Sequence, residues 1–208
     1  MARTQAADFE QRREAIVATA AKLYAARGFL GASMAEIAAA CKTSKSLIYH
    51  YYPSKEDILF DVMDSHVQSL VEAARAIETG NNPADARIRS IALALMRLYA
   101  GAEANQKVLL NELGNLPAER RAIIIDHQRQ LLDVMDRLLL EVRSDLSGDK
   151  PRRRALVMMF FGMLNFTHTW FDQNGPIRGS EIAMMAAEMF LAGLAPQGTR
   201  KKQKTPKI

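Results

Sequence analysis

Helix start and stop signals are the feature of this sequence that most constrains its fold. Ser33 is followed three residues later by Glu36, and Ser54 by Asp57, a spacing typical of capping boxes that open helices. Gly28 suits a helix end, and Pro151 suits a first helical position. Sustained period-two alternation, which half-buried strands show, is absent from the sequence. The sequence therefore predicts an all-α protein.

Apolar spacing and breakers divide the chain into about nine expected helices. The first runs from about Phe9 to Arg27, with an apolar stripe of Ile16, Ala20, Leu23 and Tyr24. A second opens at Ser33, buries Met34, Ile37 and Ala38, and ends at a turn of Cys41, Lys42 and Thr43; a short third precedes Pro53. The remaining six are expected over residues 54–77, 83–100, 104–113, 117–142, 151–171 and 181–194.

Charge separates three regions. Residues 1–55 carry a net charge of +4, residues 56–195 carry −4, and residues 196–208 carry +5. We expect a basic three-helix domain over 1–55, a larger helical-bundle domain over 56–195, and a disordered basic tail over 196–208. A basic head beside an acidic body favours an anionic partner for the head, nucleic acid first, although a solvated surface would carry the same charge.

Cysteine content and hydropathy indicate the compartment. Cys41 is the single cysteine, so no internal disulfide can form, which suits a reducing environment. No signal pattern opens the chain, and the longest apolar run, Ala155 to Leu164, is too short to span a bilayer. We expect a cytoplasmic protein with no membrane partner.

The segment TSKSLIYHYYPSK, residues 43–55, has little apolar bulk for its length. Two short helices joined by a tight turn, the second rich in polar tips, have the layout of a helix-turn-helix. Leu47 and Ile48 can anchor the second helix, which leaves Lys45, Ser46, Tyr49 and His50 free to meet base edges and phosphates. Lys55, beside free N–H groups at the next helix start, suits a phosphate.

The order of these elements resembles the DNA-binding domain of TetR-type transcriptional regulators. The matching pieces are Ser33-Met-Ala-Glu-Ile-Ala, Ser44-Lys-Ser, Leu47-Ile-Tyr-His-Tyr-Tyr and Lys55-Glu-Asp-Ile-Leu. The resemblance implies a homodimer that binds palindromic operator DNA, with a ligand pocket and dimer face in the C-terminal domain. Lys42 stands where the family often has glycine, which implies strain if the backbone is left-handed there. The DNA contacts it implies are Ser33, Thr43, Ser44, Lys45, Ser46, Tyr49, His50, Tyr51 and Lys55.

The stretch from Met158 to Phe171 is the most distinctive part of the body. It is rich in methionine and aromatic residues on more than one helical face, which fits a ligand pocket, a core or a dimer interface. Together with the last helix it is similar to the TetR-type subgroup that responds to acyl-CoA thioesters. In that subgroup a tryptophan commonly stands at Phe166 and a tyrosine at Phe171. The resemblance implies an acyl-CoA effector, no cofactor, and dimerisation through the last two helices.

Ligand contacts are expected from several helices of the body. Arg152, Arg153 and Arg154 are either a solvated cluster or a phosphate site, since positive charge at a helix start opposes the dipole. The candidate ligand residues are Met96, Tyr99, Arg129, Arg153, Met163, Asn165, Phe166 and Trp170.

Catalytic signatures are missing from the sequence, so we do not expect an enzyme. There is no nucleophile elbow, phosphate loop, dinucleotide fingerprint or zinc-protease motif. Glu56, Asp57, Asp61 and Asp64 form an acidic face that we expect to be solvated. The favoured function is a repressor released by an acyl-CoA thioester that controls fatty-acid or aromatic-acid catabolism. The alternatives are a repressor of efflux or another pathway sensing a different hydrophobic molecule, and a helical protein-interaction scaffold.

Overall fold

The computed structural model describes the backbone of residues 2–194 and the side chains of residues 8–194. Every regular element in this range is helical, as expected. The predicted disordered tail, 196–208, lies outside the described residues. The helices are α1 (Ala2–Arg27), α2 (Met34–Ala40), α3 (Lys45–Tyr51), α4 (Lys55–Glu78), α5 (Ala84–Gly101), α6 (Glu103–Asn111), α7 (Ala118–Val142), α8 (Lys150–Asn165) and α9 (Gly179–Leu194), with short 3-10 turns η1 (Leu113–Asn115), η2 (Ser144–Leu146) and η3 (Phe166–Thr169).

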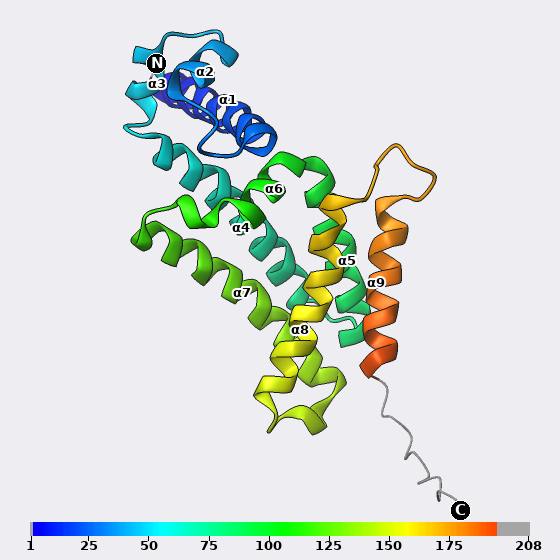
Figure 1. The fold of residues 1–208 in the computed structure, drawn as a ribbon. Helices are drawn as coiled ribbons and strands as arrows, with labels where there is room; N and C mark the ends of the chain where they lie inside the picture. The colour runs from blue at the N-terminus through cyan, green and yellow to red at the C-terminus, as the bar shows by residue number, and fades with distance from the viewer. Residues whose placement is uncertain (1, 195–208) are drawn as a thin grey trace, which may run out of the picture.

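The helices α1 to α3 form a small head at one end of the molecule (Figure 1). Ile16, Ala20 and Tyr24 of α1 are buried, as their spacing predicts. Residues 2–8 extend α1 beyond its predicted start, since they are mostly good helix formers and contain no breaker. The predicted capping box is confirmed, because the Ser33 hydroxyl accepts from the Glu36 N–H and the Glu36 carboxylate accepts from the Ser33 N–H.

The turn between α2 and α3 contains the left-handed residue that the sequence suggested. Lys42 has a φ of 55°, which costs little only for glycine. Its N–H donates to the Ala39 carbonyl, and the Thr43 N–H donates to the Ala38 carbonyl. These bonds close the end of α2 in the manner of a Schellman motif.

The long helix α4 leaves the head and runs through the body (Figure 1). It packs against α1 in the head and against α5, α6 and α7 in the body. Its apolar face is fully buried, and it includes Ile58, Leu59, Val62 and Met63. Any tilt of α4 therefore moves the head relative to the body.

The expectation of a solvated acidic face on α4 is wrong for three of its four residues. Asp57 pairs with Arg120 of α7, and Asp64 lies 3.0 Å from the His127 imidazole of the same helix. Asp61 instead faces the head, where it pairs with Arg13 of α1 at 2.5 Å. Helices that pack on both sides of α4 supply the partners, and sequence spacing along one helix does not reveal them.

The helix predicted over residues 151–171 ends at Asn165, which corrects that expectation. Residues 166–169 form η3, and the chain then turns away toward α9. Side chains compete for the last carbonyls: the Thr167 hydroxyl donates to the Leu164 carbonyl at 2.6 Å, and the Thr169 hydroxyl to the Phe166 carbonyl at 2.7 Å. This break directs η3 toward α6 and opens space beside α5.

Candidate DNA-binding face and effector cavity

The outer face of α3 is polar and exposed. Ile48 is fully buried and Leu47 half-buried, so these two residues hold α3 against the head. The Ser44 side chain caps α3 by accepting from the Leu47 N–H at 3.1 Å. The Lys45 ammonium lies 5.6 Å from the Tyr49 ring centre. The predicted contacts that share this exposed face are Ser44, Lys45, Ser46, Tyr49 and His50.

The remaining predicted DNA contacts lie at the rim of this face or inside the head. Ser33 is exposed, but its hydroxyl is engaged with Glu36, and Thr43 is half-buried. Tyr51 is half-buried and stacks on Phe9 of α1, with ring centres 4.6 Å apart.

The Lys55 side chain bonds to the backbone of the head. Its ammonium donates to the carbonyls of Phe29 and Ala32, each at 2.8 Å, and lies over the Phe29 ring. The charged tip therefore holds the loop between α1 and α2, and only the start of α4 remains near the outside. This position differs from the outward phosphate clamp that the sequence suggested.

Tyr52, which follows α3 directly, connects the head to α4. It is 4% exposed, its hydroxyl donates to the Asp61 carboxylate at 2.7 Å, and it accepts from the Arg13 guanidinium at 3.1 Å. Burial, followed by the bond to Asp61, raises the pKa of the Tyr52 phenol. The sequence shows a run of tyrosines but does not show which of them turns inward.

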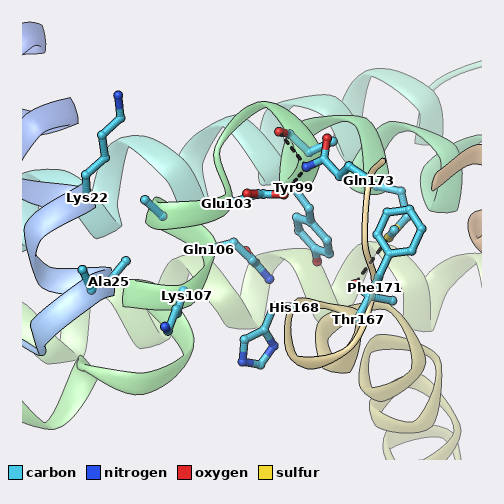
Figure 2. A pocket seen from close by; sticks show the side chains of 14 residues that line it. Lys22, Ala25, Tyr99, Glu103, Gln106, Lys107, Thr167, His168, Phe171 and Gln173 are labelled. Atoms are coloured by element: carbon cyan, nitrogen blue, oxygen red, sulfur yellow. Dashed lines mark hydrogen bonds between the residues drawn. The ribbon is translucent and has the colours of Figure 1, made fainter. Parts of the chain in front are cut away.

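A cavity of about 420 Å³ lies where α1, α5, α6 and η3 meet (Figure 2). One end is mainly apolar, with Met96, Tyr99 and Phe171 around it. The opposite end reaches α1, where Ala25 and Lys22 line it, with Lys107 of α6 nearby. Gln106 and His168 lie between the two ends (Figure 2). The volume is that of a small-molecule site.

A chain of buried and half-buried polar side chains runs from the cavity wall to α4. The Tyr99 hydroxyl donates to the Asn165 side-chain oxygen at 2.8 Å, and the Gln106 amide donates to the same oxygen at 3.3 Å. The Gln106 oxygen faces His66 Nε2 of α4 at 2.8 Å. Burial lowers the pKa of His66 and raises the pKa of Tyr99. The wall thus joins the cavity to α4.

Two of the predicted ligand residues, Met96 and Tyr99, line this cavity. Asn165 lies behind Tyr99 and bonds to it, and Met163 is half-buried. Three more lie outside the cavity lining and are exposed: Arg129 on α7, Phe166 at 63% and Trp170 at 56%.

Arg153 is a structural residue of the body rather than a free cation. It is 7% exposed, pairs with Asp136 at 2.9 Å, and donates to the carbonyls of Leu146 and Ser147. Sequence reasoning missed most of the cavity lining, because the lining comes from α1, α6 and the η3 break. The missed residues include Lys22, Gln106, Lys107 and Gln173, whereas Thr167, His168 and Phe171 lie within the predicted Met158–Phe171 stretch but were not among the candidate ligand residues.

An exposed polar helix on a three-helix head, joined by one long helix to a hollow helical body, defines a ligand-responsive helix-turn-helix transcriptional regulator. Residues 16–62 match the family model described as bacterial regulatory proteins, tetR family. Residues 81–194 match the model for a tetracyclin repressor-like C-terminal domain. The chain belongs to the TetR family of transcriptional regulators. The matching families and relatives are regulators and not enzymes.

Known proteins of this family are similar over most of the chain. A TetR-family regulator from Bordetella parapertussis 12822 has 34% identity and a TM-score of 0.83, over 86% of this chain and 93% of that one. The regulator HbdR of Aromatoleum sp. (strain CIB) is 27% identical over 77% of this chain and 69% of its own length. AibR, solved with isovaleryl coenzyme A and operator DNA, has 27% identity and a TM-score of 0.76, over 86% of this chain and 97% of its own.

Within residues 2–194, no helix is both long and apolar enough to cross a bilayer.

Proposed function

We propose that this protein is a homodimeric repressor that leaves its operator when an acyl-CoA thioester binds, and that it controls genes of fatty-acid or aromatic-acid breakdown in the cytoplasm. The observation that carries the proposal is the cavity between α1 and the body, which touches both the DNA-binding head and the helices of the ligand domain. The proposed division is a DNA-binding domain over 1–55 and a ligand and dimerisation domain over 56–195.

The proposed DNA contacts are the exposed side chains of α3. Lys45 and His50 offer donors to base edges or phosphates, and Ser44, Ser46 and Tyr49 offer hydroxyls. Ser33, Thr43 and Tyr51 flank this face, and Lys55 positions it from inside. In a dimer, two such helices enter successive major grooves about 34–36 Å apart.

The chemistry of the cavity supports a thioester effector. Met96 and Phe171 suit an acyl chain, and methionine adapts to its shape. Gln106 and Tyr99 place an amide and a hydroxyl on the wall, near where a carbonyl would follow the chain. The AibR complex shows that a relative at 27% identity binds a coenzyme A thioester together with operator DNA.

The proposed dimer face is the outer surface of α8 and α9. The two helices pack together, and four methionines remain exposed on them, at 48 to 68% of their surface. Exposed apolar side chains that gather on two packed helices suit an interaction site. The four residues are Met158, Met159, Met185 and Met189.

The proposed mechanism is a population shift between two positions of the head. A ligand between α1 and α6 favours one packing of these helices, and α4 transmits the change through His66 and Tyr52. The equilibrium shifts only by the difference in ligand affinity between the two states. An effector that binds the DNA-incompatible state more tightly therefore releases the operator.

Binding to genomic DNA fragments tests this function. We expect a sequence-specific gel shift that weakens steeply with salt, since phosphate contacts release counterions. Isovaleryl-CoA, octanoyl-CoA or phenylacetyl-CoA should reverse the shift, whereas the free acids should leave it unchanged. Release by an unrelated hydrophobic compound and by none of these thioesters would instead favour a repressor with a different effector.

A further inference from the structure

We propose that the phosphate-bearing end of the effector lies between α1 and α6 and is bound by Lys22 and Lys107, so that the DNA-binding head itself supplies part of the effector site. This inference rests on the proposed acyl-CoA effector and names the residues that would hold its nucleotide end.

Two neighbouring hollows define the path of the ligand. The cavity of about 420 Å³ adjoins a second hollow of about 520 Å³, which continues along α1 and α6. Ala25, Ala26, Lys107 and His168 line both. If the acyl chain of the ligand lies at the Met96 end, the polar end of the ligand extends toward α1. The small alanine side chains of α1 leave room for it there.

Two lysines mark the α1 end of this path. Lys22 and Lys107 are exposed, and among the side chains described for residues 8–194 neither ammonium has an ion-pair or hydrogen-bond partner. The path also holds two carboxylates, Glu103 and Glu112, which keep their negative charges. Glu103 accepts from the neutral Gln173 amide, and Glu112 accepts from the neutral Asn115 amide at 2.7 Å. The proposed phosphate site therefore rests on the two lysine ammonium groups, which can donate to phosphate oxygens.

The two lysines lie on different sides of the junction between head and body. Lys22 is on α1, inside the matched DNA-binding region, and Lys107 is on α6, inside the matched C-terminal region. An anion held by both would tie α1 to α6 directly. The nucleotide end of the ligand would then contribute to the position of the head and not only to affinity.

A comparison of full and truncated ligands tests this inference. Isothermal titration should measure the full-length protein with isovaleryl-CoA, octanoyl-CoA and phenylacetyl-CoA, and with the N-acetylcysteamine thioesters of the same acids, which lack the nucleotide. The test variant is Lys22→Glu with Lys107→Glu. The matched control is Arg75→Glu with Arg121→Glu, an equal charge change on α4 and α7, outside both hollows and outside α8 and α9.

We expect the test variant to bind the CoA thioesters at least about tenfold more weakly, since two charge-assisted contacts are lost. Its affinity for the truncated thioesters should stay unchanged, and the control should match the wild type with both ligand sets. If Lys22→Glu with Lys107→Glu does not fold by circular dichroism, Lys22→Gln with Lys107→Gln takes its place, with the same pattern and a smaller loss.

The outcomes separate this inference from the proposed function. Wild-type protein that binds none of the CoA thioesters would contradict the proposed effector itself. Wild-type binding that survives unchanged in the lysine variant, or falls equally in the control, would leave the effector standing and overturn the assignment of Lys22 and Lys107.

Discussion

Lys42 is the one non-glycine residue with a positive φ among the residues that the structure describes. A residue with a side chain loses roughly 1–2 kcal/mol in a left-handed backbone conformation, and glycine avoids this strain. Part of the advantage is offset because glycine loses more conformational entropy on folding. We predict that Lys42→Gly raises the free energy of unfolding by about 0.5–1 kcal/mol in urea denaturation. Lys42→Ala removes the same charged side chain but keeps Cβ, so it should give no such gain. Equal stability of the two variants would show that the turn is not strained.

His66 links stability to pH. Burial lowers its pKa in the folded protein below the ordinary value of 6.5, so the unfolded chain binds the proton more readily. The contribution of His66 is therefore full above pH 6.5 and is lost as the pH falls through the lower folded pKa. We predict that the free energy of unfolding, measured with urea, falls as the pH falls through this window. In His66→Gln the free energy of unfolding should depend less steeply on pH over the same window. A His66→Gln curve with the wild-type slope would refute this assignment.

At the residue level the sequence predicts the outer side of the head better than its inner side. The exposure of Lys45, Ser46, Tyr49 and His50 follows from the anchoring of Leu47 and Ile48. The inward positions of Tyr52 and Lys55 depend on partners far away in the sequence. Tyr52 accepts from Arg13, and Lys55 donates to the Phe29 carbonyl. Local spacing carries no signal for such contacts.

At the scale of elements, helix starts are predicted well because they are local. The Ser33 capping box and the Ser54 cap need only the next three residues. The break at Asn165 was missed because methionine and aromatic residues continue the helical pattern to Phe171, while the competing bonds come from Thr167 and Thr169. The cavity depends on this break, so its lining could not be read from the pattern.

The exposed methionines on α8 and α9 lead to a prediction about assembly. Met189 is 68% exposed in the single chain, and a two-fold interface would bury two copies of it. We predict that Met189→Lys raises the dimer dissociation constant at least roughly a hundredfold, because two unpaired charges would be buried. Analytical ultracentrifugation checks this result.

A second lysine variant serves as the control for assembly. Ile123 of α7 is 43% exposed and lies outside α8 and α9, so Ile123→Lys should leave the dimer intact. Loss of the dimer in both variants would indicate a general effect of added charge. An unchanged dimer in Met189→Lys would move the interface elsewhere.

At the scale of the whole molecule, the head and the body meet through few elements. α1 packs on α4 and α6, and α4 continues from the head into the body (Figure 1). The polar chain of Tyr99, Asn165, Gln106 and His66 joins the cavity to α4 by hydrogen bonds of 2.8 to 3.3 Å. A ligand in the cavity would contact α1 and the hydrogen-bonded chain that leads to α4, the two connections between the body and the head.

A cavity-filling variant gives the most direct test that this cavity controls DNA binding. Ala104 is half-buried and lines the cavity from α6, so Ala104→Phe occupies the space that the effector needs. The measurement is the fluorescence anisotropy of a labelled operator as a CoA thioester is added. We predict that the CoA thioester releases the operator from the wild type, and that it leaves Ala104→Phe at the operator affinity that this variant has without ligand. Equal release from Ala104→Phe would contradict the account, because the effector would then act at another site.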